Sequence, residues 1–309
     1  PDTALRSLSH DGSGEEPGFK DPHTGTWDLR PHAARIESID ESTLKIWQSV
    51  TDSEDWRSTP MVSTVNSAAA RTISTLATQQ RIGSLELQFS SGWNETNDFE
   101  DGRFIKKWGE TSWNDAILQG PHLYVSTPLY KRPNKTMKHN QDWTSTDLEV
   151  LPADALPITQ YKPAGNRTIY DRLYTHWGDS SARDHYRIAW RRMAKNTNER
   201  TLIPVIIPPG ATHVHTTYST AVHSKDLSLL PLILASASTL LADFQIRARS
   251  RNDIINQDFE RLPCLDKTHL FTPQVVLRTL RLNCLTDAYA DLWAECWDES
   301  FATDAPILG

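Results

Sequence analysis

Lysine and arginine side chains gather in two stretches near the middle of the chain. The first, residues 127–140, contains the run PLYKRPNKTMKHN, which has two prolines and no acid, and the second, residues 191–200, mixes cations with asparagines. Cations gain affinity for nucleic-acid phosphates by releasing counterions, and arginine or asparagine can read base edges. These residue types therefore favour contact with DNA. The candidate DNA-binding residues here are Lys131, Arg132, Lys135, Lys138, Arg191, Arg192, Lys195, Asn198 and Arg200.

Each stretch also has a structural interpretation. Cations without nearby acids can simply be solvated, and the composition of residues 127–140 favours an exposed loop without regular structure. Arg191 and Arg192 are adjacent and point to opposite faces of a strand, so at least one of them must be paired inside the protein. The corner at residues 197–200 can be architectural, with asparagines closing a turn and Glu199 bridging Arg200. Residues 127–140 are thus the better candidate for direct contact.

The sequence contains none of the common catalytic motifs. G-x-S-x-G, H-E-x-x-H, G-x-x-x-x-G-K and G-x-G-x-x-G are all absent. His213 and His215 would lie on one side of a strand, but no convincing third ligand is close in sequence, which favours structural histidines over a metal site. Asp142, Asp147 and Glu149 could hold Mg²⁺, although a solvated loop is the simpler interpretation. We therefore predict no catalytic, metal-binding or cofactor-binding residue in this chain.

Charge is distributed unevenly along the 309 residues, whose net charge is −7. Residues 1–60 carry twelve acids and six bases, whereas residues 103–139 carry seven bases and two acids. No lysine or arginine follows Arg281, while acids accumulate there. A basic middle between acidic ends predicts one positively charged face built by the middle of the chain.

The remaining composition indicates an intracellular protein. The three cysteines, Cys264, Cys284 and Cys296, form an odd set without close spacing, as expected of reduced thiols. No run of eighteen apolar residues is present, which predicts no contact with a membrane. The chain begins Pro-Asp-Thr, with no initiator methionine and no secretory signal, so we expect a cytoplasmic fragment of a longer polypeptide.

The hydrophobic pattern predicts both strands and helices. The expected strands are residues 84–90, 104–108, 122–127, 186–191 and 202–207. The expected helices are a short one capped by Asp40, one over 66–80, one over 226–251, and a last one that starts at Thr272-Pro273 and reaches Cys296. The third helix ends in Arg247, Arg249 and Arg251, cations at the negative end of the helix dipole that we add to the DNA-binding candidates.

Four stretches, taken together, resemble a known family. They are residues 186–201 with Ile207-Pro-Pro-Gly210, residues 229–249 with Ala242-Asp-Phe244, residues 258–263, and residues 278–286. Over roughly residues 85–300, the order and spacing look like the C-terminal target-recognition region of large N6-adenine DNA methyltransferases. That family belongs to phage-defence and restriction-modification systems and includes type IIG, BREX-type and DISARM-type enzymes.

The resemblance implies a function without implying catalysis. In the family, this region binds duplex DNA and selects the sequence, while a separate Rossmann-like domain binds S-adenosylmethionine and methylates a flipped adenine. The methyl-transfer signature, Asn or Asp followed by Pro-Pro-Tyr or Phe, is absent here, and Ser126-Thr-Pro-Leu-Tyr lacks the acid or amide that holds the amino group. The implied function is a non-catalytic DNA target-recognition module, with S-adenosylmethionine held by an upstream methyltransferase domain.

The predicted fold class is accordingly α+β, a mixed β-sheet target-recognition region with a helical C-terminal part. The predicted parts are an acidic linker with a short helical piece (1–60), the β-rich target-recognition region (61–222) and the helical part (223–309). Two other functions stay open. The acidic ends, residues 11–28 and 287–304, could dock another subunit of a defence complex in a protein-interaction module. An enzyme acting on DNA near His213 has less support.

Overall fold

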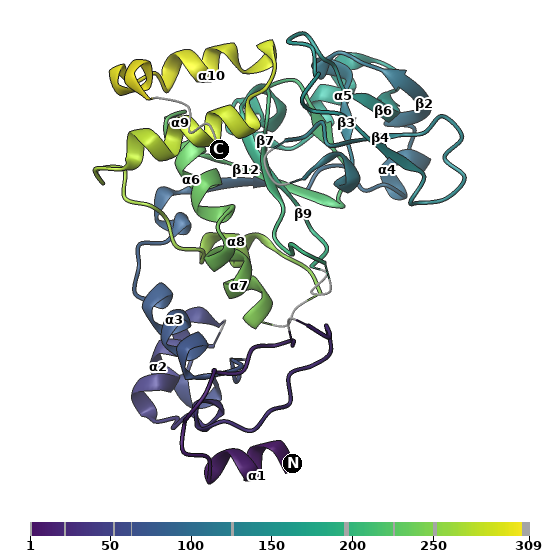
Figure 1. Ribbon diagram of the computed structural model, residues 1–309. Helices are drawn as coiled ribbons and strands as arrows, with labels where there is room; N and C mark the ends of the chain where they lie inside the picture. Colours follow the sequence, from purple (N-terminus) through teal and green to yellow (C-terminus); the bar gives the residue numbers. More distant parts are fainter. Residues whose placement is uncertain are drawn as a thin grey trace. The chain divides into compact units, whose positions relative to one another are not determined.

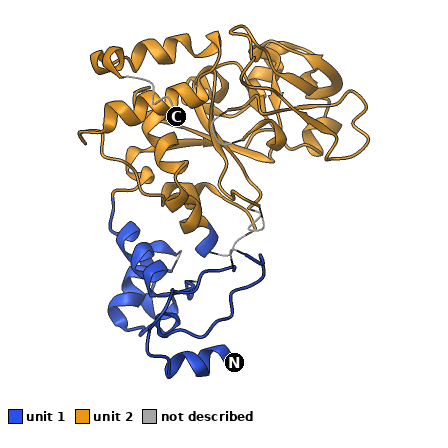
Figure 2. Cartoon of the chain, viewed as in Figure 1, with its two compact units in different colours: residues 1–79, 247–250 blue, residues 80–246, 251–309 orange. Residues whose placement is uncertain are grey.

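The computed structural model describes residues 2–21, 23–51, 53–62, 64–124, 127–194, 198–224, 226–249 and 252–304 (Figure 1). They belong to two compact units, residues 1–79 with 247–250 and residues 80–246 with 251–309 (Figure 2). The boundary between the units falls near the end of α7 (Leu240–Ala248). Helices and antiparallel sheets are both present, which confirms the predicted α+β class.

The first unit contains the short helices α1 (Asp2–Leu8), α2 (Glu41–Val50) and α3 (Ser67–Ala77). Capping side chains fix the starts of α2 and α3. The Asp40 carboxylate accepts a hydrogen bond from the backbone N–H of Thr43 at 2.8 Å, and Asn66 caps α3 in the same way. Trp47 of α2 and Ile73 of α3 are buried. Both helices predicted for this part of the chain are confirmed.

A four-stranded antiparallel sheet lies at the centre of the second unit. Its strands, in spatial order, are β1 (Leu87–Ser90), β12 (Thr217–Val222), β9 (Arg187–Arg191) and β10 (Pro204–Ile207). Both faces are covered by apolar side chains. Ile188 and Trp190 belong to a large core with the C-terminal helices, whereas Ala189 packs with Val205 and other residues in a second core. A sheet buried on both faces leaves no solvent-exposed face for Arg187, which is fully buried.

Five helices follow the sheet in the second half of the chain: α6 (Leu229–Ala237), α7, α8 (Asn256–Glu260), α9 (Thr272–Asn283) and α10 (Ala290–Glu295). The prediction of one helix over 226–251 is wrong, because α6 and α7 are bent by 59° at a break. The Thr239 hydroxyl accepts a hydrogen bond from the N–H of Ala242 and so caps a new helix. No single helix within the described residues is long and apolar enough to cross a membrane, although this bent pair passes that test of length and composition together.

The last predicted helix is also divided. α9 ends at Asn283, whose side chain leaves the helix to hydrogen-bond both backbone groups of Ile206 on the edge strand β10, at 2.9 and 3.1 Å. The Tyr289 hydroxyl donates to the same carbonyl at 2.8 Å. These bonds satisfy the open edge of the sheet, a requirement that helical periodicity does not reveal. In Figure 1, α9 lies beside α6.

The other part of the second unit is built from short strand pairs and two helices. The pairs are β2 (Phe104–Glu110) with β6 (Ile158–Pro163), β4 (Lys131–Pro133) with β5 (Trp143–Ser145), β7 (His176–Trp177) with β8 (Ser180–Ser181), and β3 (Ile117–Leu118) in parallel with β11 (Thr212–His213). The helices are α4 (Asn97–Glu100) and α5 (Arg167–Leu173). Trp93, Phe104 and Tyr161 belong to a third core here.

Three predicted strands have different bounds. β1 starts only at Leu87, because residues 82–85 form a tight turn and Glu86 has a left-handed backbone. β10 starts at Pro204, since the N–H groups of Thr201 and Leu202 are taken by the Asp243 carboxylate, both at 2.7 Å. The strand predicted over 122–127 is wrong: Tyr124 and Thr127 hydrogen-bond to each other, which an extended strand excludes.

Candidate nucleic-acid interface

Residues 131–133 of the cation-rich run form one strand of a β-hairpin, and residues 134–140 belong to its exposed loop, as the composition predicts. Lys131–Pro133 of β4 pairs antiparallel with Trp143–Ser145 of β5. Pro133 is tolerated because its carbonyl, not an N–H group, is used: it accepts a hydrogen bond from the Trp108 indole of β2 at 2.7 Å. Pro133 and Leu129 are buried and anchor the hairpin to the unit. We call residues 131–145 the basic hairpin.

Asp142 organises the loop of the basic hairpin. Its carboxylate accepts hydrogen bonds from the Asn134 amide at 2.7 Å, the Thr136 hydroxyl at 2.9 Å and the N–H of Lys138 at 3.0 Å. These bonds, that from Asn134 foremost, lower the pKa of Asp142 to about 2. The Asp142 carboxylate is thus a structural group of the loop.

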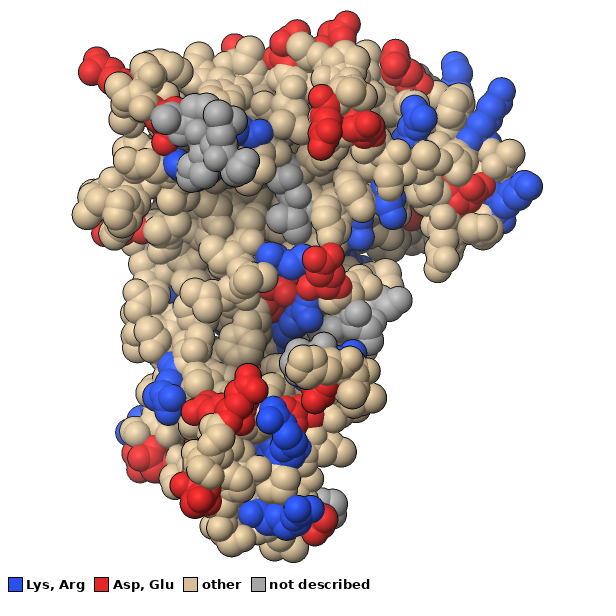
Figure 3. Space-filling model, viewed as in Figure 1, with Lys and Arg blue, Asp and Glu red and all other residues tan. Residues whose placement is uncertain are grey.

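The four predicted cations of the basic hairpin point away from acids. Arg132, Lys135 and Lys138 are exposed, and the half-exposed Lys131 ammonium lies 5.3 Å above the ring of Tyr130. Among the acidic residues that the structure describes, none forms an ion pair with these four side chains. Figure 3 shows lysine and arginine side chains exposed over the part of the second unit that holds β2, β4 and β6. Their charge is available to a polyanion.

The arginines after β9 are engaged by the protein itself. Arg191 donates from Nε to the Gly120 carbonyl at 2.8 Å and from Nη2 to the Leu123 carbonyl, and burial lowers its pKa. Arg192 pairs with Asp253 at 2.9 Å and lies 5.6 Å above the Tyr218 ring. The internal pairing predicted for at least one of the two adjacent arginines holds for both.

Arg200 is likewise tied to the α6–α7 break. Its Nη2 donates to the carbonyls of Ser238 at 2.8 Å and Thr239 at 3.2 Å. Its Nε lies 3.7 Å from the buried Asp243 carboxylate, an ion pair too long for a hydrogen bond. We call residues 187–191 and 200–207, with their partner Asp243, the platform. Its cations are part of the fold.

The remaining predicted site residues lie elsewhere or are not described. Asn198 is exposed in the second unit. Arg247, at the last turn of α7, and Arg249 are half-buried and belong to the first unit. Lys195 and Arg251 lie outside the described residues. The described candidates are thus divided between the two units, most of them lying in the second.

A cavity of about 690 Å³ does bring three of them together. Lys138 of the basic hairpin, Arg191 of the platform and Asn198 all line it. Aromatic and amide side chains complete its walls, namely Trp143, Tyr161, Gln119 and Gln160, with Glu95 and Lys106 beside them. Sequence analysis missed these wall residues because they come from strands and turns that share no local motif.

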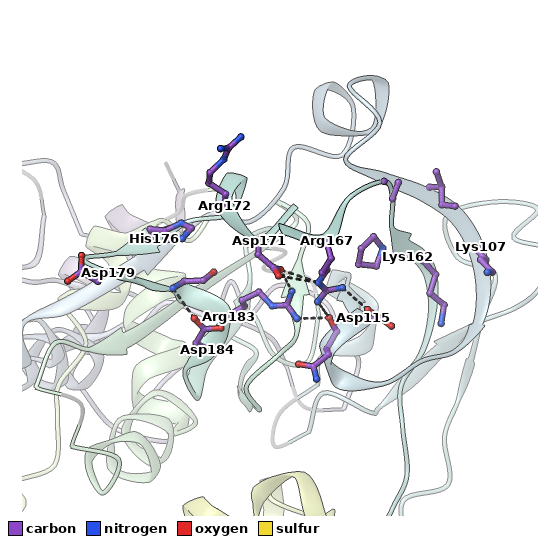
Figure 4. Close-up of a pocket in the computed structure, with 16 residues that line it drawn as sticks. Lys107, Asp115, Lys162, Arg167, Asp171, Arg172, His176, Asp179, Arg183 and Asp184 are labelled. Atoms are coloured by element: carbon purple, nitrogen blue, oxygen red, sulfur yellow. Dashed lines mark hydrogen bonds and ion pairs between the residues drawn. The ribbon is translucent and has the colours of Figure 1, made fainter. Parts of the chain in front are cut away.

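A second cleft, of about 970 Å³, is lined by acids and bases in nearly equal number (Figure 4). Arg167 reaches Asp115 at 2.6 Å and Asp171 at 3.2 Å, and the buried Arg183 contacts Asp171 from the other side. Both arginines also donate to the carbonyl of Asn114. Arg167 and Arg183 are thereby paired with carboxylates inside the cleft, and these two cations are part of the fold rather than available to a polyanion.

Of the two histidines weighed as a metal pair, His213 is fully buried and His215 is half-buried. His213 contacts the Ser219 hydroxyl through Nε2 at 2.8 Å and has its pKa lowered to about 3, chiefly by burial. His215 accepts a hydrogen bond from the N–H of Glu95 at 3.2 Å. No group of three metal-ligating side chains occurs within the described part of the chain.

No protein-family model matches the chain, and a search of curated proteins finds no match.

Proposed function

We propose that this chain is a DNA target-recognition module that binds duplex DNA through the basic hairpin. The proposal extends to the resembled family: the parent protein would be a cytoplasmic, S-adenosylmethionine-dependent adenine DNA methyltransferase of a phage-defence or restriction-modification system. Methyl transfer and S-adenosylmethionine binding are assigned to a separate methyltransferase domain, and other defence-system subunits are further partners.

The single observation that carries the proposal is the state of the cations in the basic hairpin. Lys131, Arg132, Lys135 and Lys138 project from a loop whose only nearby carboxylate, within residues 127–145, is Asp142, and that carboxylate is used by the loop itself. When a solvated cation has no internal partner, its binding to a phosphate costs little free energy. A cation that is already in an ion pair must first break that pair.

The hairpin also has the rigidity that recognition requires. Its strands hydrogen-bond to each other, and Trp108 and Asp142 fix the two ends of the loop. The amides of Gln119 and Gln160 line the neighbouring cavity, so groups of a kind that read base edges lie beside cations that bind the backbone. Phosphate contacts and base contacts would thus come from one side of the second unit.

The test is charge reversal at Lys131, Arg132 and Lys135. If each contacts one phosphate, the triple glutamate variant loses about three units of the slope of log Kd against log salt concentration, because each phosphate contact contributes about 0.9. Fluorescence anisotropy with a random-sequence duplex at several salt concentrations measures this slope. An unchanged slope and affinity would remove the hairpin from the interface.

A matched control separates local contact from total charge. Reversing Lys20, Lys45 and Arg57 in the first unit changes net charge by the same amount without touching the hairpin. This control variant is expected to keep most of the wild-type slope. If it loses as much as the hairpin variant, binding reflects overall charge only.

The protein-interaction alternative retains one specific observation. Leu270, Phe271, Leu282 and Trp297, in or next to the C-terminal helices, are each more than half exposed. No mobility shift of random duplex at low salt, with or without a partner subunit, would favour that function over DNA recognition.

A further inference from the structure

The cavity beside the basic hairpin is lined by aromatic, amide and cationic side chains. Trp143 of β5 supplies an indole at the wall, held edge-on against the buried ring of His122 with ring centres 4.8 Å apart. Lys138 and Lys106 lie at the same cavity, the former exposed at the hairpin loop. An aromatic face beside free cations is the combination that stacks a base and holds its phosphate.

The amide wall has an unused hydrogen-bonding group. Gln119 is 8% exposed, and its amide nitrogen donates to Glu95 at 3.1 Å. The Tyr161 hydroxyl donates to the same carboxylate oxygen at 2.8 Å, which fixes this wall. The amide oxygen of Gln119 has no partner within the described residues. A buried acceptor without a donor is costly, and the exocyclic amine of a base is a donor of the right kind.

The size of the cavity limits what can enter. A volume of about 690 Å³ lies within the usual range of about 300–1,000 Å³ for small-molecule sites and is too small for a duplex. A base inside a duplex also has its faces covered by its neighbours, so only an unstacked base can reach Trp143.

We propose that this cavity binds a single nucleotide unstacked from the bound DNA, with its base on Trp143 and against Gln119 and its phosphate on Lys138. The proposal rests on the proposed function, since the nucleotide comes from DNA held by the basic hairpin. It adds a binding site for one nucleotide beside the phosphate contacts of the basic hairpin.

The first experiment compares a fully paired duplex with the same duplex carrying one bulged nucleotide. The wild-type chain is expected to bind the bulged duplex about tenfold tighter, the gain typical of one base stacked on an aromatic side chain. Trp143→Ala should abolish that preference and Trp143→Phe should keep most of it. Equal affinity of the wild type for the two duplexes overturns the proposal.

A second experiment compares substitutions of Lys138 and Lys135, neither of which is part of the buried core. Both are exposed on the same loop, but only Lys138 lines the cavity. With the four deoxynucleoside 5′-monophosphates as probes in calorimetry, Lys138→Ala should weaken binding about fivefold to tenfold and Lys135→Ala should leave it unchanged. Equal losses, or no nucleotide that binds better than deoxyribose 5-phosphate, count against the cavity.

The two proposals fail differently. If the triple reversal flattens the salt dependence while bulged and paired duplexes bind equally, the hairpin interface stands and the nucleotide cavity falls. If nucleotides bind but no duplex does at low salt, the proposed function falls, and with it the assignment of the nucleotide to DNA.

Discussion

The basic hairpin and the platform are two cation-rich regions of one unit, and they use their cations in opposite ways. On the platform, Arg191 and Arg200 donate to backbone carbonyls, and Arg200 also faces Asp243. On the hairpin, Arg132 and Lys135 are exposed and unpaired among the described acids. In sequence, residues 127–140 and residues 191–200 look alike, because both combine lysine, arginine and asparagine.

The difference comes from the nature of the surroundings. The platform strands are apolar on both faces, so any cation between them must find carbonyls or a carboxylate as it leaves water. Two buried residues, Leu129 and Pro133, attach the hairpin to the unit, and most of its loop is exposed to solvent. Cations next to a strand that is buried on both faces therefore stabilise the fold. Cations on the hairpin that Pro133 anchors stay in solvent and are available to a ligand.

The largest effect is expected at Asp243, the carboxylate that the platform encloses. Asp243→Ala removes the acceptor of two backbone N–H groups and the partner of Arg200, and should lower the free energy of unfolding of the second unit by about 3–5 kcal/mol. Urea unfolding followed by tryptophan fluorescence measures the change.

Asp243→Asn is the matched control, because it keeps an oxygen for the N–H groups and loses only the charge. It is expected to cost less than Asp243→Ala. A loss below about 1 kcal/mol for the alanine variant would mean that Arg200 and its corner are not built into the fold, and the contrast with the hairpin would fail.

Local patterns predict much of this fold and little of the cavity. Asp40, Asn66 and the alternation after Tyr186 act within a few residues, so the helices they start and the strand β9 follow from the sequence. The end of α9 depends on Asn283 finding a tertiary partner in Ile206, which no local pattern records. The α6–α7 break has a local cap at Thr239, but the apolar residues on both sides of it continue the helical pattern and conceal it.

The candidate site divides in the same way. The hairpin cations are recognisable because they are close in sequence and lack acids. Trp143, Gln119 and Gln160 reach one cavity from separate strands and turns, and only the pairing of β4 with β5 and of β2 with β6 assembles them. Composition therefore predicts the exposed cationic segment but not the residues around the cavity.

His122 packs against Trp143 of the basic hairpin and makes the stability of the fold around it sensitive to acid. Its Nδ1 accepts from the N–H of Gln119 and its Nε2 donates to the Ile158 carbonyl, each at 2.9 Å, so the ring is neutral. Burial lowers its pKa to about 4, below the value of about 6.5 expected when unfolded. The unfolded state therefore binds a proton more readily in this window.

As pH falls from about 6.5 to about 4, stability should drop by up to about 1.4 kcal/mol per pH unit through His122 alone. His213 acts in the same direction, so His122→Gln should remove only part of the slope. Unfolding free energies at several pH values between 7 and 5 measure it. Identical slopes in the wild type and the variant would show that His122 is not held neutral in the fold.

The smallest effects on stability should come from the hairpin cations, and they sharpen the comparison most. Arg132→Ala and Lys135→Ala are each expected to change the free energy of unfolding by less than about 0.5 kcal/mol, because the side chains are exposed and unpaired. Arg192→Ala breaks a partly exposed ion pair with Asp253 and should cost up to about 1 kcal/mol. Duplex affinity should show the reverse order, with the hairpin variants weakened and Arg192→Ala nearly unchanged. A hairpin variant that destabilises the unit more than Arg192→Ala would mean that its cations, too, belong to the fold.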